Sequence, residues 1–119
     1  WTGKVIRHST KYDIDHILPV SVYPINEMWN LIPSDPYYNS HTKRDRIPGQ
    51  DRLEKAREPL SKTYGVYQSA ESLAGPLQTD VANRFYQFRK EKIIKPQEIS
   101  SAVVQYINTV ADSRNLERF

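Results

Sequence analysis

The chain has 119 residues, of which 38% are hydrophobic and 26% are charged, and its formal net charge is +3. This length is enough for one modest core, so we expect a single domain over residues 1–119. Cysteine is absent, which excludes disulfide bonds and zinc sites held by cysteine. No apolar stretch approaches the roughly 18 residues that cross a membrane, and no signal segment opens the chain, so we expect a cytoplasmic protein.

The first strong pattern in chain order is a strand that ends in a pair of polar residues. Residues 1–11 are largely polar, with a short apolar piece at Val5 and Ile6 that predicts an edge strand. The next strand is expected to end at Asp15 and His16, because Pro19 follows three residues later and proline interrupts strand pairing. Neighbours on a regular strand point to opposite faces, so these two side chains are expected to have different roles.

A helix is predicted to begin near Pro36 and to run toward Arg46. Proline suits the first turn of a helix, and Ser34 or Asp35 is the expected cap. The sequence at 47–49, Ile-Pro-Gly, ends the helix.

Beyond residue 49 the pattern becomes helical. We predict helices over 52–56, stopped near Pro59, over 60–73, over 79–92 with Val81, Phe85 and Phe88 directed inward, and over 96–111. The last of these has apolar residues at the three-and-four spacing of an amphipathic helix, and Pro96 suits its first turn. Residues 50–119 are therefore expected to form a helical extension.

Three short motifs follow one another within the 37 residues from Tyr12 to Pro48. They are Asp-His-Ile-Leu-Pro at 15–19, Trp-Asn-Leu-Ile-Pro at 29–33 and Asn-Ser-His-Thr-Lys-Arg-Asp at 39–45. Their order resembles the HNH nucleases, the ββα-metal or His-Me finger family, and is similar to HNH domains of bacterial and phage endonucleases, including restriction and defence enzymes. The resemblance covers about a third of the chain. It implies an α+β fold, with a ββα-metal core over residues 12–48 followed by the helical extension.

The resemblance also implies a role for each motif residue. His16 is the expected general base, since a neutral imidazole with an ordinary pKa of about 6.5 accepts a proton near neutral pH. Asp15 and Asn39 are the expected ligands of one Mg²⁺ or Mn²⁺, since hard cations prefer oxygen donors. Asn30 is expected to fix the loop that carries His16, through hydrogen bonds to its backbone. The implied activity is metal-dependent hydrolysis of DNA, with RNA left open as a substrate.

Basic residues lie in two groups. Lys43, Arg44 and Arg46 are next to the predicted site, so phosphate contacts are expected for them. The second group lies downstream and is interleaved with glutamates, so a solvated helix face and a nucleic-acid contact both stay open. Its members are Arg84, Arg89, Lys90, Lys92 and Lys95.

Other polar residues near the motifs have simpler interpretations. Asp13 shares a strand face with Asp15 and is either a solvated carboxylate or support for the metal. His41 is the fallback ligand if Asn39 is not one, and His8 is most simply exposed. Asp45 is expected to pair with neighbouring cations.

Two alternatives to a nuclease remain open. One is a domain that binds nucleic acid on the same fold without cutting it, and the other is a histidine-dependent phosphodiesterase that acts on small nucleotides. The chain begins at Trp1, which we interpret as a fragment of a larger protein with an upstream recognition or regulatory module. A second copy of the chain is the other expected partner, because one site alone nicks a duplex.

Overall fold

The computed structural model describes residues 13–19, 21, 23, 26–34 and 46–119. Its elements in chain order are strand β1 (Asp13–His16), the short 3-10 helix η1 (Met28–Asn30), strand β2 (Leu31–Ser34), helices α2 (Gln50–Ser69) and α3 (Glu71–Arg84), the short 3-10 helix η3 (Tyr86–Phe88) and helix α4 (Pro96–Arg114). The fold is α+β, as expected. The predicted edge strand at Val5 and Ile6 and the helix predicted from Pro36 lie outside the described residues.

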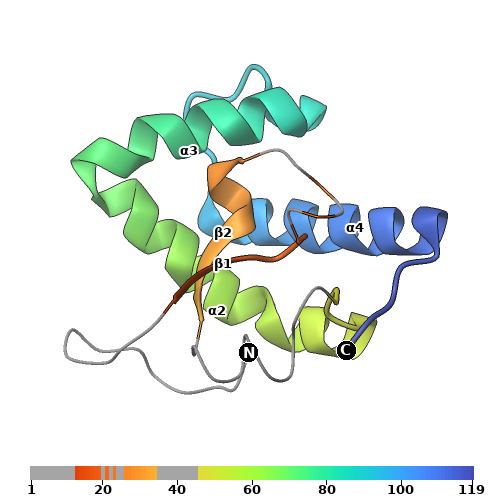
Figure 1. The fold of residues 1–119 in the computed structure, drawn as a ribbon. Coiled ribbons are helices and arrows are strands. Elements are labelled where there is room, and N and C mark those ends of the chain that lie inside the picture. The colour runs from red at the N-terminus through yellow and green to blue at the C-terminus, as the bar shows by residue number, and fades with distance from the viewer. Residues whose placement is uncertain (1–12, 20, 22, 24–25, 35–45) are drawn as a thin grey trace.

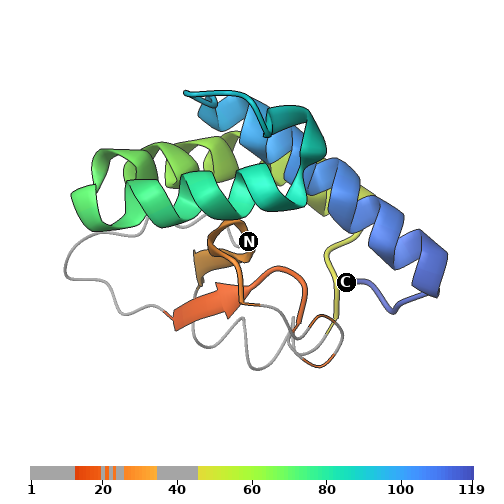
Figure 2. The same cartoon turned by 90° about the horizontal axis from the view of Figure 1, so that it is seen from above.

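The two strands form an antiparallel pair that places the motif residues. Asp15 is opposite Ile32, and His16 is opposite Leu31. Strand β1 ends at His16, which confirms the expected end of the strand. Figures 1 and 2 show that the pair lies against one side of a layer made by the helices, in which α2 and α3 diverge from their junction as a V and α4 packs against α2.

One apolar cluster joins the strand region to the helices. Its centre is the fully buried Trp29, whose ring lies 5.4 Å from that of Phe85 and 5.6 Å from that of Tyr106, measured between centroids. Tyr23 packs on the same indole at 6.0 Å. Large aromatic side chains contribute much buried area, so these contacts tie Tyr23 and Trp29 to the end of α3 and to α4.

The predicted helix break at Pro59 is wrong. Helix α2 continues through Pro59 from Gln50 to Ser69. A proline inside a helix removes one backbone hydrogen bond, but here the proline is exposed while the opposite face is buried through Leu53, Ala56, Leu60 and Tyr64. Burial of one continuous stripe stabilises the helix by more than the lost bond costs.

The third helix also begins and ends earlier than predicted. Helix α3 spans Glu71–Arg84 instead of 79–92, and Phe85 is its C-cap. Phe85 and Phe88 are buried as expected, but a 3-10 turn rather than an α-helix places Phe88 there. The predicted helix over 96–111 is confirmed and extends to Arg114, where Asn115 ends it in the left-handed conformation with a φ of 50°.

Across the part of the chain that the structure describes, none of the helices has the length and apolar character needed to span a bilayer.

Candidate functional site

The end of β1 presents two different chemical groups on its two faces. Asp15 is only 8% exposed and lies on the face shared with Ile32 and Ser34. His16 lies on the opposite face with Ile14, which is 56% exposed, and is itself half-buried. The alternation of the strand therefore separates an acidic oxygen donor from an imidazole by one residue.

The imidazole of His16 is hydrogen-bonded to Asn26. Its Nε2 atom lies 2.8 Å from Oδ1 of Asn26, in the loop between β1 and η1. An amide oxygen is only an acceptor, so this contact requires a proton on Nε2. The sequence analysis did not identify Asn26, because an asparagine ten residues from a histidine is no recognisable motif.

Asn30 holds the backbone just after His16. Its Oδ1 accepts a hydrogen bond from the N–H of Leu18 at 2.8 Å, and its Nδ2 donates to the carbonyl of Leu18 at 3.0 Å. Its own carbonyl accepts from the N–H of Ile17 at 2.9 Å. Asn30 is fully buried, so these bonds replace water for groups that would otherwise be unsatisfied. Three bonds from one residue therefore fix positions 17 and 18.

The buried carboxylate of Glu27 accepts hydrogen bonds from three surrounding side chains. Its Oε1 accepts from Tyr23 Oη at 3.1 Å and from Arg84 Nη2 at 3.0 Å, and its Oε2 accepts from Trp29 Nε1 at 3.1 Å. Burial lowers the pKa of Arg84, but the hydrogen bond and charge of Glu27 outweigh it, so that pKa is raised. Glu27 was not identified from the sequence. Arg84 was a member of the second basic group, and its guanidinium pairs with the carboxylate of Glu27.

Helices α2 and α3 hold the chain between residues 28 and 31. The hydroxyl of Tyr64 donates to the carbonyl of Trp29 at 2.6 Å, and that of Tyr67 donates to the carbonyl of Leu31 at 2.6 Å. Asp80 accepts from the N–H of Met28 at 2.9 Å. Burial, with a smaller effect of Tyr67, raises the pKa of Tyr64, so its hydroxyl remains a donor. The helical extension thus supports the segment that contains Asn30.

Several predicted site residues fall outside the described residues. These are Asn39, Lys43 and Arg44, together with the alternatives His8, His41 and Asp45. Arg46 is described, and its guanidinium lies 5.8 Å from the ring centroid of Phe119. The neighbouring Ile47 forms backbone hydrogen bonds with Glu117 and Phe119 at 3.0 and 2.8 Å. The C-terminal residues therefore fix the chain directly after the predicted helix.

One oxygen donor at the end of β1, the carboxylate of Asp15, suits a hard cation. Within the described ranges, no group of three or more His, Cys, Asp or Glu side chains is arranged to hold a metal ion. The expected pair of one carboxylate and one amide oxygen is a smaller set, and Mg²⁺ commonly completes such a set with water and phosphate. Asp15, a buried carboxylate at a strand end, fits the first of these two positions.

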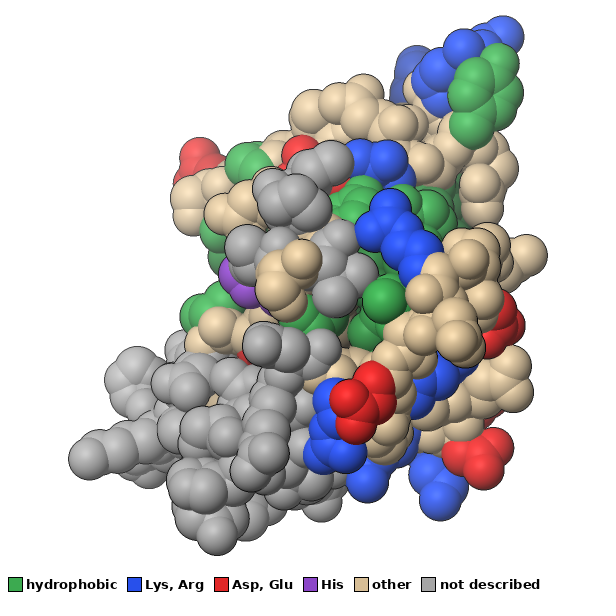
Figure 3. Space-filling model, turned by 45° about the vertical axis from the view of Figure 1, so that its right-hand side comes forward, with side chains coloured by type: hydrophobic (Ala, Val, Ile, Leu, Met, Phe, Trp, Pro, Cys, Tyr) green, Lys and Arg blue, Asp and Glu red, His purple; other side chains and the backbone are tan. Residues whose placement is uncertain are grey.

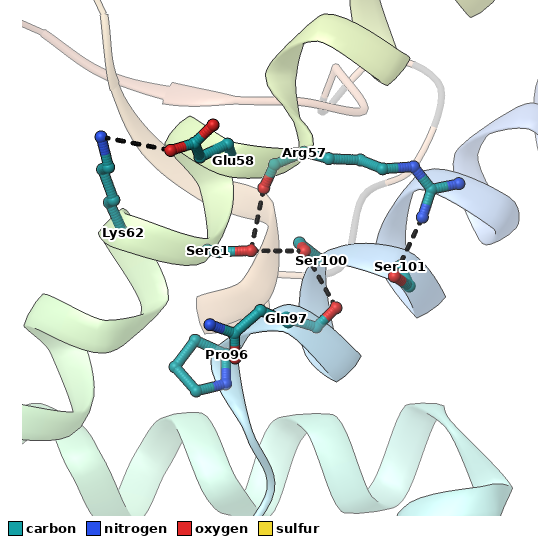
Figure 4. A pocket seen from close by; sticks show the side chains of 8 residues that line it. All are labelled: Arg57, Glu58, Ser61, Lys62, Pro96, Gln97, Ser100 and Ser101. Carbon is teal, nitrogen blue, oxygen red and sulfur yellow. Dashed lines mark hydrogen bonds and ion pairs between the residues drawn. The ribbon is translucent and has the colours of Figure 1, made fainter.

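A separate shallow pocket of about 540 Å³ lies between α2 and α4 (Figure 4). Its two cations already have partners, since Arg57 pairs with Glu54 at 2.7 Å and Lys62 with Glu58 at 3.7 Å. Ser61 and Ser100 are hydrogen-bonded to each other at 2.7 Å across it. None of the predicted catalytic residues lines this pocket, so it is separate from the end of β1.

Comparison with known protein families gives a match over the first part of the chain. The model of the HNH endonuclease family matches residues 1–49. No curated protein and no solved structure matches the chain. The matched range contains β1, the loop held by Asn30 and β2. Residues 1–49 of this chain therefore carry the sequence features of an HNH endonuclease domain.

Proposed function

We propose that this chain is a metal-dependent endonuclease that hydrolyses phosphodiester bonds in DNA, with His16 as the general base. One observation carries the proposal. His16 stands at the end of β1, is held by Asn26 at 2.8 Å and is followed by a backbone that Asn30 clamps. This arrangement lies within the segment that matches the HNH endonuclease family.

The hydrogen bond from His16 to Asn26 supports Nδ1 of the neutral ring as the proton-accepting atom. Nε2 donates to Asn26, so Nδ1 accepts the proton of the attacking water. The water oxygen forms a bond to phosphorus while the bond from phosphorus to the 3′ oxygen breaks. The 3′ oxygen then takes up a proton, and the products carry a 3′-hydroxyl and a 5′-phosphate, as the family resemblance implies.

Asp15 and Asn39 are proposed to hold one divalent ion, Mg²⁺ or Mn²⁺. A bound ion of this kind supplies positive charge that offsets the charge developing on the phosphate and the leaving oxygen. Asp15 provides a carboxylate from the buried face of β1. Lys43, Arg44 and Arg46 are proposed to contact phosphates and so to position the substrate without reading its sequence. A second copy of the chain is the proposed partner for cutting both strands.

The experiment is cleavage of supercoiled plasmid DNA by the full chain with Mg²⁺, with Mn²⁺ or with EDTA. His16→Ala is expected to reduce the rate by about 100- to 10,000-fold, as for loss of a general base. His8→Ala is the matched control, since it removes a histidine that is given no catalytic role, and it is expected to cut like the unmodified chain.

Each outcome of the experiment has a defined meaning. Cleavage that requires a divalent ion and His16 supports the proposal. Cleavage that His16→Ala retains removes His16 as the base. A folded chain that binds DNA but does not cut it with either ion supports the alternative, a domain of this fold that only binds nucleic acid.

A further inference from the structure

The connection between α3 and α4 concentrates the positive charge of the chain. Residues 86–95, which we call the basic segment, contain Arg89, Lys90, Lys92 and Lys95 but one acidic residue, Glu91. The net charge of these ten residues therefore equals the +3 of the whole chain. All four cationic side chains are exposed. Charge of one sign gathered on a short segment attracts a polyanion more strongly than the same charge spread over the surface.

None of these four cations forms an ion pair with an acidic side chain in the part of the chain that the structure describes. This distinguishes them from Arg84, Arg57 and Lys62, which pair with glutamates. Arg89 stacks instead on Tyr86, with its guanidinium carbon 4.2 Å from the ring centroid. The stacking leaves the charge of Arg89 available to a partner.

The backbone of the basic segment is held by two buried side chains and by hydrogen bonds from α2 and α3. Phe88 and Ile94 are buried and act as anchors at its two ends. Gln78 of α3 donates to the carbonyl of Glu91 at 3.0 Å, and Gln68 of α2 donates to the carbonyl of Ile94 at 2.7 Å. A partner therefore binds to cationic side chains whose backbone is already ordered, and this reduces the conformational entropy that is lost on binding.

We propose that the basic segment binds the sugar-phosphate backbone of nucleic acid, as a second contact apart from the bond that is cut. The choice of polyanion rests on the proposed nuclease function. In Figures 1 and 2 the connection between α3 and α4 lies on the side of the helical layer away from β1 and β2. The segment therefore contacts a stretch of the polymer that is distant from the end of β1.

The exposed surface of the basic segment suits a nucleic-acid partner. Lys and Arg side chains gather beside a hydrophobic side chain on the protruding upper right end of the molecule in Figure 3. Within the segment, Tyr86 is 72% exposed and Ile93 is 84% exposed. An exposed aromatic ring next to cations is typical of surfaces that track nucleic-acid strands. An acidic membrane surface is the competing partner, because it also attracts cations with an apolar neighbour.

The test measures binding separately from cleavage. Fluorescence anisotropy with EDTA present reports the Kd of the full chain for a labelled DNA duplex and for a labelled single strand. The variant Lys90→Gln/Lys92→Gln is compared with Lys55→Gln/Lys62→Gln, which removes the same charge from exposed positions of α2. Near-ultraviolet circular dichroism confirms that both variants are folded.

The basic-segment variant is expected to bind DNA more weakly than the control variant, and its binding is expected to depend less on salt. Each lost phosphate contact lowers the slope of log K against log salt by about 0.9 and weakens binding about eightfold at about 0.1 M salt. The basic-segment variant is therefore expected to show a Kd about tenfold or more above that of the control, and Lys90→Glu/Lys92→Glu a larger loss. An equal Kd and an equal salt slope in the two Gln variants would overturn the inference.

Two further measurements distinguish this inference from a membrane contact and from the proposed nuclease function. Binding to vesicles that contain phosphatidylserine, lost in the basic-segment variant while DNA binding is unchanged, overturns the inference in favour of a membrane contact. If neither Mg²⁺ nor Mn²⁺ supports plasmid cleavage but the basic-segment variant still loses DNA affinity, the proposed nuclease activity is wrong and the binding surface stands.

Discussion

The side-chain amide of Asn30 forms two hydrogen bonds with the main chain of Leu18, accepting from its N–H at 2.8 Å and donating to its carbonyl at 3.0 Å. Both partners are two residues from His16 along the chain. The bonds link the last residue of η1, directly before β2, to the segment just after β1, and Asn30 is fully buried. The position of the proposed base therefore depends on Asn30.

Removing this amide is expected to lower both stability and activity. Asn30→Ala leaves the N–H and carbonyl of Leu18 buried without their partners, which costs about 1–3 kcal/mol of unfolding free energy. Urea denaturation measures this loss, and plasmid cleavage below the unfolding transition measures activity. Asn83→Ala, at an exposed position of α3, is the control. A stability equal to that of the control would show that the clamp is not needed.

Asn26 is expected to act on catalysis with little effect on stability, since it is exposed. Asn26→Ala removes the acceptor that orients the ring of His16, and a misplaced catalytic group lowers the rate by about tenfold to a hundredfold. The loss should fall on kcat, while KM for DNA stays the same, because Asn26 is not proposed to contact DNA. Asn26→Ser retains an acceptor and should recover part of the rate. A change in KM alone would contradict this role.

The pair of Glu27 and Arg84 is expected to couple the loop after β1 to α3. Arg84→Gln leaves the carboxylate of Glu27 buried without its cation and is expected to cost about 1–3 kcal/mol, less than for a fully buried pair because Arg84 is partly exposed. Glu27→Gln/Arg84→Gln should cost less than the sum of the two single changes. A double-mutant cycle from urea denaturation measures this coupling, and additive losses would mean that the two side chains act independently.

Tyr64 is expected to make stability depend on alkaline pH. Its pKa is raised by burial in the folded protein, so the folded state holds its proton more tightly than the unfolded state. The stabilisation is complete below the unfolded pKa of about 10 and is lost as pH rises above it, by up to about 1.4 kcal/mol per pH unit. Tyr64→Phe should be less stable at pH 7 but lose stability less steeply above pH 10, measured by urea denaturation at a series of pH values. Equal slopes would contradict the assignment.

Local sequence patterns were sufficient for features that depend on near neighbours. The end of β1 at His16 followed from Pro19, and the helix beginning at Pro96 followed from its apolar spacing. The motifs around Asp15, Asn30 and Asn39 also carried the resemblance that the family match supports. These are patterns in which the spacing of residues along the chain determines which side chains share a face.

Contacts between distant segments were not readable in this way. The bond from His16 to Asn26, the pairing of Glu27 with Arg84 and the donation from Tyr64 to Trp29 each join elements that only folding brings together. The continuation of α2 through Pro59 has the same origin, because buried packing on one face outweighs a local propensity. Tertiary packing thus decided which polar groups support His16, since burial makes an unsatisfied group costly and selects partners by position in space.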